Sequence, residues 1–227
     1  MNRYKAILFD LDDTLLNRDH AVDELFLKVL AECYMDVNQS LKENMNEKFK
    51  DFDRRAYGDN DKTKVLAPLF EEFPPRKRLT ESGIQEFWNH HFPLCFTIEA
   101  ELLDVIRTLK EKVKVAIITN GSTARQKAKV KNTKLDDIFE VIIISEEAGC
   151  RKPDERIFKL ALDRLNVQPE DTLLVGDDLQ KDISGCQNVN IKGVWFNPYR
   201  IENNTEIQPF AEIQSLSELF SIIEANT

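Results

Sequence analysis

Residues 6–15 read AILFDLDDTL, and this stretch decides how the rest of the sequence is interpreted. Four apolar residues are followed directly by three aspartates within four positions, Asp10, Asp12 and Asp13. Carboxylates crowded this closely repel one another, and they are costly to remove from water unless they gain partners. The stretch is therefore either a solvated turn or a place where a cation is held at the end of a buried strand.

The composition is that of an ordinary globular protein. The 227 residues suffice for one large core, or for a core with a small inserted domain. The net charge of −9 argues against a nucleic-acid polymer or an anionic membrane as partner, but leaves a small anionic substrate open. Neither a signal peptide nor a membrane-length apolar stretch is evident, and the four cysteines are widely spaced. We therefore expect a cytoplasmic protein with reduced thiols.

Short apolar segments predict a parallel sheet, because nearly continuous apolar strands are typical of sheets covered on both faces. The predicted strands are residues 4–9, 114–118, 140–145, 171–176 and 190–196. Amphipathic helices are predicted over 99–111 and over 154–165, the latter with Pro153 suited to its first turn. Residues 215–218 have capping-box spacing and predict a C-terminal helix. This alternation predicts a doubly wound α/β sheet.

Residues 17–96 interrupt this alternation, since they show helical patterns and no convincing strand. Pro68 is expected to bend or delay the third of four helices, and the aromatic residues of the fourth pattern predict the core of this segment: Phe87, Trp88 and Phe92. We expect 17–96 to form a helical domain inserted into a core made of 1–16 and 97–227. Because it follows the aspartate cluster directly, it is expected to stand over the carboxyl end of the sheet.

Polar side chains follow four of the predicted strands, at the edge where open α/β sheets bind ligands. In order, they are Asp10 and Asp12, then Thr119 and Asn120, then Lys152, then Asp177 and Asp178 with Asp182 one helical turn further on. Several carboxylates at one point suit Mg²⁺. A lysine, a hydroxyl and the free N–H groups of a helix opening at Gly121 and Ser122 suit an anion. Together they describe a phosphate site, in which one aspartate can attack phosphorus and another can move a proton.

The pattern Asp10-x-Asp12-x-Thr14, then Thr119, then Lys152, then Gly176-Asp177-Asp178-x-x-x-Asp182 resembles the four ordered motifs of the haloacid dehalogenase (HAD) superfamily. The resemblance covers nearly the whole chain, with residues 17–96 at the place of that family's helical C1 cap. It implies a HAD-like, Rossmann-type, mostly parallel sheet with an inserted all-helical cap domain.

The resemblance also implies a role for each of these residues. Asp10 would be the nucleophile and Asp12 the general acid and base. Mg²⁺ would be held by the Asp10 carboxylate, the Asp12 backbone carbonyl and the Asp177 side chain, with Asp178 or Asp182 supporting these ligands or adding one. The phosphoryl group would be bound by Thr119, Asn120 and Lys152. Asp13 is given no chemical role.

Asp12 favours a phosphatase, because the dehalogenases of the superfamily lack this aspartate and need no metal. The stretches ITNG, ISEEAGCRKPD, GDDLQKDISG and VWFNP resemble the pyrimidine 5′-nucleotidase branch. We therefore expect a Mg²⁺-dependent phosphomonoester hydrolase that forms an aspartyl-phosphate, with a small phosphorylated metabolite such as a nucleoside 5′-monophosphate as substrate. A sugar-phosphate phosphatase, an N-acylneuraminate-9-phosphatase and a phosphomutase remain alternatives. A 2-haloacid dehalogenase and a non-enzymatic phospho-acceptor domain are less favoured. The sequence leaves the physiological substrate and the oligomeric state open.

Overall fold

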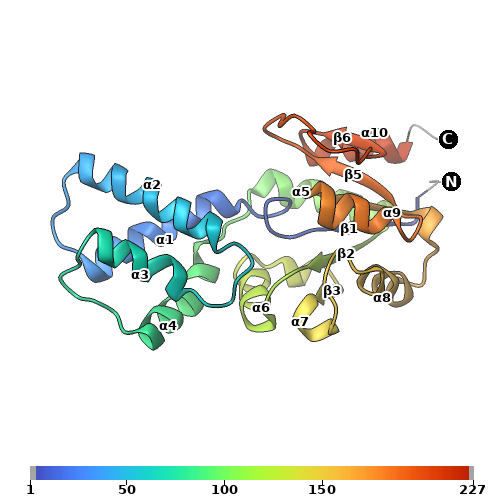
Figure 1. Cartoon of the computed structure of the whole chain (residues 1–227). Coiled ribbons are helices and arrows are strands. Elements are labelled where there is room, and N and C mark those ends of the chain that lie inside the picture. The colour runs from blue at the N-terminus through green and yellow to red at the C-terminus, as the bar shows by residue number, and fades with distance from the viewer. Residues whose placement is uncertain (1–3, 225–227) are drawn as a thin grey trace. The chain divides into compact units, whose positions relative to one another are not determined.

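The computed structural model describes residues 4–224, and its main element is a six-stranded sheet in the order β3-β2-β1-β4-β5-β6 (Figure 1). Every neighbouring pair of strands is parallel. The strands are β1 (Ala6–Phe9), β2 (Lys114–Thr119), β3 (Val141–Ile144), β4 (Thr172–Gly176), β5 (Lys192–Phe196) and β6 (Ala211–Ile213). Since β1 lies between β2 and β4, the segments that follow these three strands meet at one edge of the sheet.

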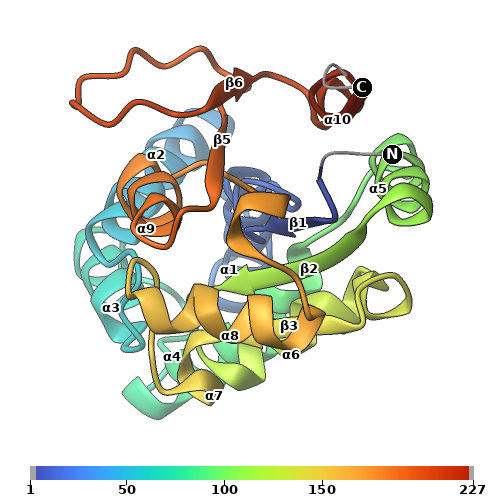
Figure 2. The same cartoon turned by 90° about the vertical axis from the view of Figure 1, so that its right-hand side faces the viewer.

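Helices cover both faces of the sheet (Figure 2). Helix α8 (Glu155–Leu165) packs against Ala6 and Leu8 of β1 in one hydrophobic core, together with residues around α9 (Gly185–Gln187). On the other face, α5 (Ala100–Lys112) buries Ile106 and Leu109. Helix α10 (Leu219–Glu224) lies beside α5, and Lys112 reaches Glu224 at 2.7 Å. The alternation of β1 side chains between two covered faces explains why its four residues are all apolar.

The remaining helical elements of this core connect the strands. They are α6 (Thr123–Asn132), α7 (Ser145–Ala148), the π-helix η4 (Leu179–Ser184) and the short 3₁₀ turns η2 (Leu135–Asp137), η3 (Pro169–Asp171) and η5 (Leu216–Glu218). At η5 the predicted capping box is present: the Ser215 hydroxyl accepts from the backbone, and the Glu218 carboxylate accepts from the Ser215 backbone N–H at 2.8 Å.

The structure confirms the five predicted strands and differs from the prediction at three points. Strand β6 was missed, because a three-residue edge strand in which only Ile213 is buried has no apolar run. Pro153 does not lie in the first turn of α8. Instead Asp154 caps that helix by accepting from the Arg156 N–H, and Pro153 precedes the cap. Pro68 does not delay its helix, which begins at Thr63 and continues through the proline.

Residues Arg18–Thr97 form a second compact unit, separate from the unit that contains residues up to Asn17 and from Ile98 onward. Its helices are α1 (Arg18–Cys33), α2 (Gln39–Arg55), α3 (Thr63–Glu72), α4 (Glu81–His91) and the 3₁₀ turn η1 (Phe92–Cys95). Its core is aromatic, as predicted: the rings of Phe49 and Trp88 lie 6.0 Å apart, and those of Trp88 and Phe92 lie 5.2 Å apart.

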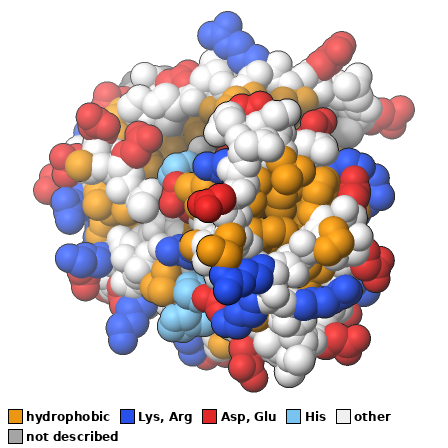
Figure 3. Space-filling model, turned by 90° about the vertical axis from the view of Figure 1, so that its left-hand side faces the viewer, with side chains coloured by type: hydrophobic (Ala, Val, Ile, Leu, Met, Phe, Trp, Pro, Cys, Tyr) orange, Lys and Arg blue, Asp and Glu red, His pale blue; other side chains and the backbone are white. Residues whose placement is uncertain are grey.

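The surface mixes charges of both signs. Figure 3 shows one face, on which acidic and basic side chains are interspersed around a hydrophobic patch. Many of these charges form exposed ion pairs, such as Lys48 with Glu72 at 3.0 Å. Within residues 4–224, no helix has both the length and the apolar content that a membrane span needs.

A buried ion pair fixes the start of α1 to α2, because Arg18 Nη1 lies 2.7 Å from Asp53 Oδ2 and both side chains are nearly inaccessible. We expect Asp53→Ala to lower the free energy of unfolding by about 3–5 kcal/mol, since it leaves a buried guanidinium without its counter-ion. Urea unfolding followed by circular dichroism measures this loss. The matched control is Asp51→Ala on the same helix, whose pair with Arg55 is exposed and whose loss should cost about 0–1 kcal/mol. Equal losses in the two variants would contradict the assignment.

Candidate active site

The residues predicted to act together do lie at the carboxyl end of the sheet. Asp10 follows β1 directly, Thr119 is the last residue of β2, and Asp177 follows β4. The backbone N–H of Asp10 donates to the Val175 carbonyl at 2.9 Å, which carries the pairing of β1 and β4 to the site. Lys152 arrives from the loop after β3 and α7. The parallel arrangement of strands therefore brings together Asp10 and Asp177, which are 167 positions apart in the sequence.

Lys152 lies between two carboxylates. Its Nζ is 2.6 Å from Asp10 Oδ1 and 2.6 Å from Asp182 Oδ1, and only 2% of the side chain is exposed. Burial alone would lower the pKa of Lys152, but the charges of Asp10 and Asp182 outweigh it and raise that pKa. Lys152 is therefore a permanent cation here, with Asp10 on one side of it and Asp182 on the other.

The carboxylates of Asp10, Asp177 and Asp182 together have the donor chemistry of a Mg²⁺ site. One oxygen each from Asp10, Asp177 and Asp182 lie within 4.8 Å of one another. Burial, together with the charges of Asp10 and Asp182, raises the pKa of Asp177 to about 9, and burial raises that of Asp182 as well. Crowded carboxylates that resist ionisation fit a hard cation, because a bound Mg²⁺ compensates their charge with oxygen ligands.

Hydrogen bonds hold both the side chain and the backbone carbonyl of Asp177. The Thr14 hydroxyl donates to Asp177 Oδ1 at 3.3 Å, and the Trp195 indole N–H donates to the Asp177 carbonyl at 2.8 Å. Gly176 precedes it because no larger residue fits: a Cβ there would lie 2.5 Å from Asp182 Cγ. The glycine thus allows Asp182 to approach β4 closely enough to reach Lys152.

Two of the expected site residues make contacts that position the backbone. The Asp178 carboxylate accepts from the N–H groups of Gln180 and Lys181 and caps η4. The Asn120 amide accepts from the Lys152 N–H at 2.9 Å and donates to the Lys152 carbonyl at 3.0 Å. Asn120 thereby fixes the segment that carries Lys152, while a contact of Asn120 with phosphate stays a prediction.

The start of α6 differs from the prediction of free N–H groups. The Gly121 N–H donates to the Ser145 hydroxyl at 3.0 Å, and the Thr123 N–H donates to Glu146 Oε2 at 2.7 Å. Both partners lie in α7, which brings a hydroxyl and a carboxylate to this helix start. The N–H groups of Gly121 and Thr123 are therefore not available to an anion in this arrangement.

Asp12 lies on the turn after β1 and faces α6. Its two carboxylate oxygens are 2.7 and 2.8 Å from Lys129 Nζ, and Gln126 Nε2 donates to one of them at 3.0 Å. Asp13, next to it, adopts a left-handed backbone with φ of 60°. Asp10 contacts Lys152 whereas Asp12 contacts Lys129, so the two aspartates have different cationic partners.

Gln126 and Lys129 are the functional candidates that the sequence reasoning missed. The available signal was their spacing of three residues on α6, which begins at Thr123, shortly after Thr119, and this spacing places them on one helix face. The pattern of apolar residues does not reveal their burial, because both side chains are polar and yet buried. A buried lysine is recognised from its counter-ion, and only the folded structure brings Asp12 close to Lys129.

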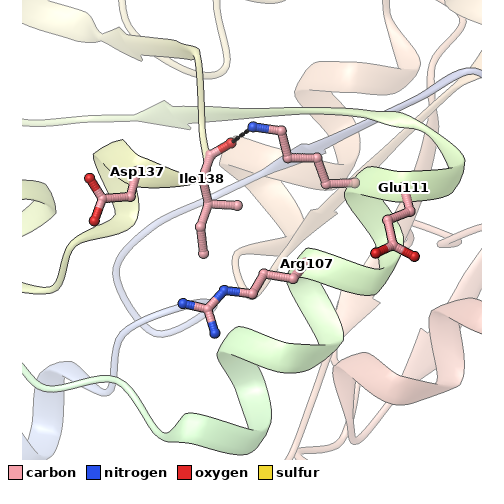
Figure 4. A pocket seen from close by; sticks show the side chains of 5 residues that line it. Arg107, Glu111, Asp137 and Ile138 are labelled. Carbon is pink, nitrogen blue, oxygen red and sulfur yellow. Dashed lines mark hydrogen bonds between the residues drawn. The ribbon is translucent and has the colours of Figure 1, made fainter.

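A separate cavity of about 450 Å³ is lined by Arg107, Lys110, Glu111, Asp137 and Ile138 (Figure 4). These residues precede β2 and β3, so the cavity belongs to the amino end of the sheet, opposite the aspartates. Lys110 Nζ already donates to the Ile138 carbonyl at 2.5 Å. The lining has two cations and two anions, which gives it no preference for a charged ligand.

Comparisons with known proteins identify the family of this chain. A family model of haloacid dehalogenase-like hydrolases matches residues 7–196. A glyceraldehyde 3-phosphate phosphatase of Pyrococcus furiosus is 31% identical, over 99% of this chain and 95% of its own length. The pyrimidine 5′-nucleotidase PynA of Streptococcus pneumoniae is 30% identical, over 98% of this chain and 96% of its own.

Solved structures share the fold. The HAD-hydrolase YfnB of Bacillus subtilis, solved with magnesium bound, matches with a TM-score of 0.77 at 24% identity, covering 98% of this chain and 99% of that one. An L-2-haloacid dehalogenase of Xanthobacter autotrophicus matches with a TM-score of 0.73 at 16% identity, covering 99% and 100%. The match of the family model to most of the chain, including β1 through β5, shows that this protein belongs to the haloacid dehalogenase-like hydrolases.

Proposed function

We propose that this protein is a Mg²⁺-dependent phosphatase of small phosphorylated metabolites, working through an aspartyl-phosphate on Asp10. The observation that carries the proposal is the pair of aspartates on one turn, Asp10 beside Lys152 at 2.6 Å and Asp12 beside Lys129 at 2.7 Å. One carboxylate can attack while the other moves a proton. A fold shared with dehalogenases does not separate the two reactions, but Asp12 supports phosphoryl transfer.

The proposed reaction has two steps. An oxygen of Asp10 bonds to phosphorus, the bond from phosphorus to the leaving oxygen breaks, and that oxygen takes a proton from Asp12. Water then gives a proton to Asp12 and bonds to phosphorus, and the bond from phosphorus to Asp10 breaks. This releases inorganic phosphate and restores the Asp10 carboxylate. Lys152 and the Thr119 hydroxyl would hold phosphoryl oxygens during both steps.

Asp10, Asp177 and the Asp12 carbonyl would hold Mg²⁺, with Asp182 in support through Lys152. The bound ion supplies positive charge against which phosphoryl oxygens are stabilised. The raised pKa of Asp177, about 9, supports this assignment, because such a carboxylate is stable in its ionised form only beside added positive charge.

The relatives' names suggest two substrate classes, a triose phosphate and a pyrimidine nucleoside 5′-monophosphate. Both are phosphate esters of a primary alcohol. We propose this common chemistry as the substrate class, and we keep the nucleotide as the first compound to test because the sequence stretches after β2, β3 and β4 resemble that branch.

Phosphate release from a panel of nucleotides, sugar phosphates and triose phosphates tests the proposal. Wild-type protein should release phosphate with Mg²⁺ and lose this activity in excess EDTA. Asp10→Asn should lower turnover by at least about a thousandfold, since it removes the attacking oxygen. The control is Asp13→Asn, the same change three residues away at a left-handed position that asparagine accepts, and it should keep most of the activity.

Other outcomes identify other reactions. Wild-type turnover in Asp10→Asn would refute the nucleophile assignment. Conversion of a hexose 1-phosphate to its 6-phosphate would show a phosphomutase, and halide release from 2-chloropropionate would show a dehalogenase. Absence of phosphate release from the whole panel would contradict the proposed function.

The crowded carboxylates also predict a pH dependence of stability without metal. The pKa of Asp177 is 3.8 ordinarily and about 9 in the fold, so between these values the folded state holds a proton that the unfolded state has released. Stability is therefore full below the lower value and falls as the pH rises through the higher one. Thermal unfolding in EDTA should show this fall, and excess Mg²⁺, which binds the folded state, should reduce it.

Asp177→Asn is the control for this experiment, because it removes the titrating group with little change in shape. Its unfolding temperature in EDTA should depend less on pH over the same window. A wild-type protein whose stability rises with pH in EDTA, or a variant with an unchanged slope, would contradict the assignment.

A further inference from the structure

We propose that Lys129 and Gln126 of α6 are positioning residues, which set the Asp12 carboxylate and the Thr119 hydroxyl in the orientations that phosphoryl transfer requires. The inference rests on the proposed function. It adds two residues outside the motifs of the family, and it assigns them to the proton transfer and to the binding of the phosphoryl group respectively.

Lys129 is a buried cation whose charge is paired with the Asp12 carboxylate. Its side chain is 5% exposed and that of Asp12 is 15% exposed, and its Nζ lies 2.7 and 2.8 Å from the two oxygens. Removing both charges from water is costly, so a buried pair is maintained only with good geometry. Contact with both oxygens restricts rotation of the carboxylate about its Cβ–Cγ bond. The pair therefore holds Asp12 in one orientation relative to Asp10.

Gln126 connects Asp12 with Thr119. Its Nε2 donates to Asp12 Oδ2 at 3.0 Å and to Thr119 Oγ1 at 2.6 Å. The amide orientation follows from chemistry: in this arrangement Asp12 is an ionised carboxylate paired with Lys129, so it accepts hydrogen bonds and the NH₂ end of the amide must face it. For the first step of the proposed reaction, Asp12 takes up its proton after this state. Thr119 Oγ1 consequently accepts from Gln126, which leaves the hydroxyl proton to donate to a phosphoryl oxygen.

Gly121 makes the room for this arrangement. A Cβ on Gly121 would lie 2.9 Å from Gln126 Cγ, and φ of this glycine is +154°. The Thr119-Asn120-Gly121 segment thus supplies both the hydroxyl and the space for the side chain that orients it. The contacts of Gln126 and Lys129 on one face of α6 form a single connection between the acid-base residue and the phosphate-binding residue.

The proton transfer gives the positioning role a signature of its own. An alkyl phosphate has a basic leaving oxygen that needs a proton as the bond breaks, whereas p-nitrophenyl phosphate has a stable leaving anion that needs none. A residue that only maintains the fold affects both substrates equally. Hydrolysis of the aspartyl-phosphate, in which Asp12 takes a proton from water, is common to both substrates. A residue that positions Asp12 therefore distinguishes the substrates in kcat/KM, which covers the steps up to release of the leaving group, and lowers it chiefly for the alkyl substrate.

The experiment compares Lys129→Met with Lys127→Met, using the best alkyl phosphate of the panel and p-nitrophenyl phosphate. Lys129→Met should lower kcat/KM for the alkyl phosphate about 10- to 100-fold and should leave kcat/KM for p-nitrophenyl phosphate nearly unaffected. Lys127 is the matched control, since it is 60% exposed on the same helix and pairs with Glu147. Its variant should behave as wild type. Equal losses on both substrates, an increase, or no loss in Lys129→Met overturns the inference.

Gln126→Met tests the second contact and removes the amide while keeping the length of the side chain. It should raise the inhibition constant of inorganic phosphate as well as lower kcat, because the Thr119 hydroxyl loses the bond that directs it. An unchanged inhibition constant overturns the role assigned to Gln126, and it does so even if Lys129→Met fails to fold.

A stability cycle separates this inference from the proposed function. Unfolding of Lys129→Met, Asp12→Asn and the double variant is measured in EDTA, where activity plays no part. The loss in the double variant should be smaller than the sum of the single losses, because either change alone breaks the pair. If no substrate of the panel is hydrolysed, the proposed function fails, and additive losses in this cycle overturn the pairing separately.

Discussion

The ion pairs of Lys152 are the interaction on which the arrangement of the candidate site depends. An ammonium group that is almost fully buried is stable only because Asp10 and Asp182 surround it. Asp10 follows β1 directly, and Asp182 lies in η4, which follows β4. The two ion pairs therefore connect the loop after β3 with the ends of two neighbouring strands. The Asn120 amide fixes the backbone of Lys152 at the same place. The site and the stability of this edge of the sheet are therefore parts of one network.

The carboxylates of the site have different partners, because Lys152 pairs with Asp10 and Asp182 whereas Lys129 pairs with Asp12. Lys152 faces Asp10 and Lys129 faces Asp12, while Asp177 has the hydroxyl of Thr14 and a strongly raised pKa. Carboxylates with different partners can perform different tasks although their chemistry is the same.

The sequence predicted the sheet well because β1 to β5 are short apolar segments that end in polar residues, and parallel pairing follows from that pattern. It predicted the order in which site residues follow the strands for the same reason. Strand β6 escaped prediction because edge pairing by three residues leaves no periodicity. Gln126 and Lys129 escaped because a polar residue on a helix is expected to face solvent. Their burial is a property of the packed structure, and no local pattern encodes it.

The helical unit interrupts the chain between β1 and β2, and this has a consequence for synthesis on the ribosome. Its residues Arg18–Thr97 are continuous, so the unit has all of its own sequence early in translation. The sheet does not, because β1 lies between β2 and β4 and pairs with residues 114–117 and 172–175. Pairings over such separations in sequence form slowly. The apolar β1 lacks at least one of its two neighbouring strands until β4 has emerged, after about three quarters of the chain. We therefore expect β1 to be a segment that chaperones protect during synthesis.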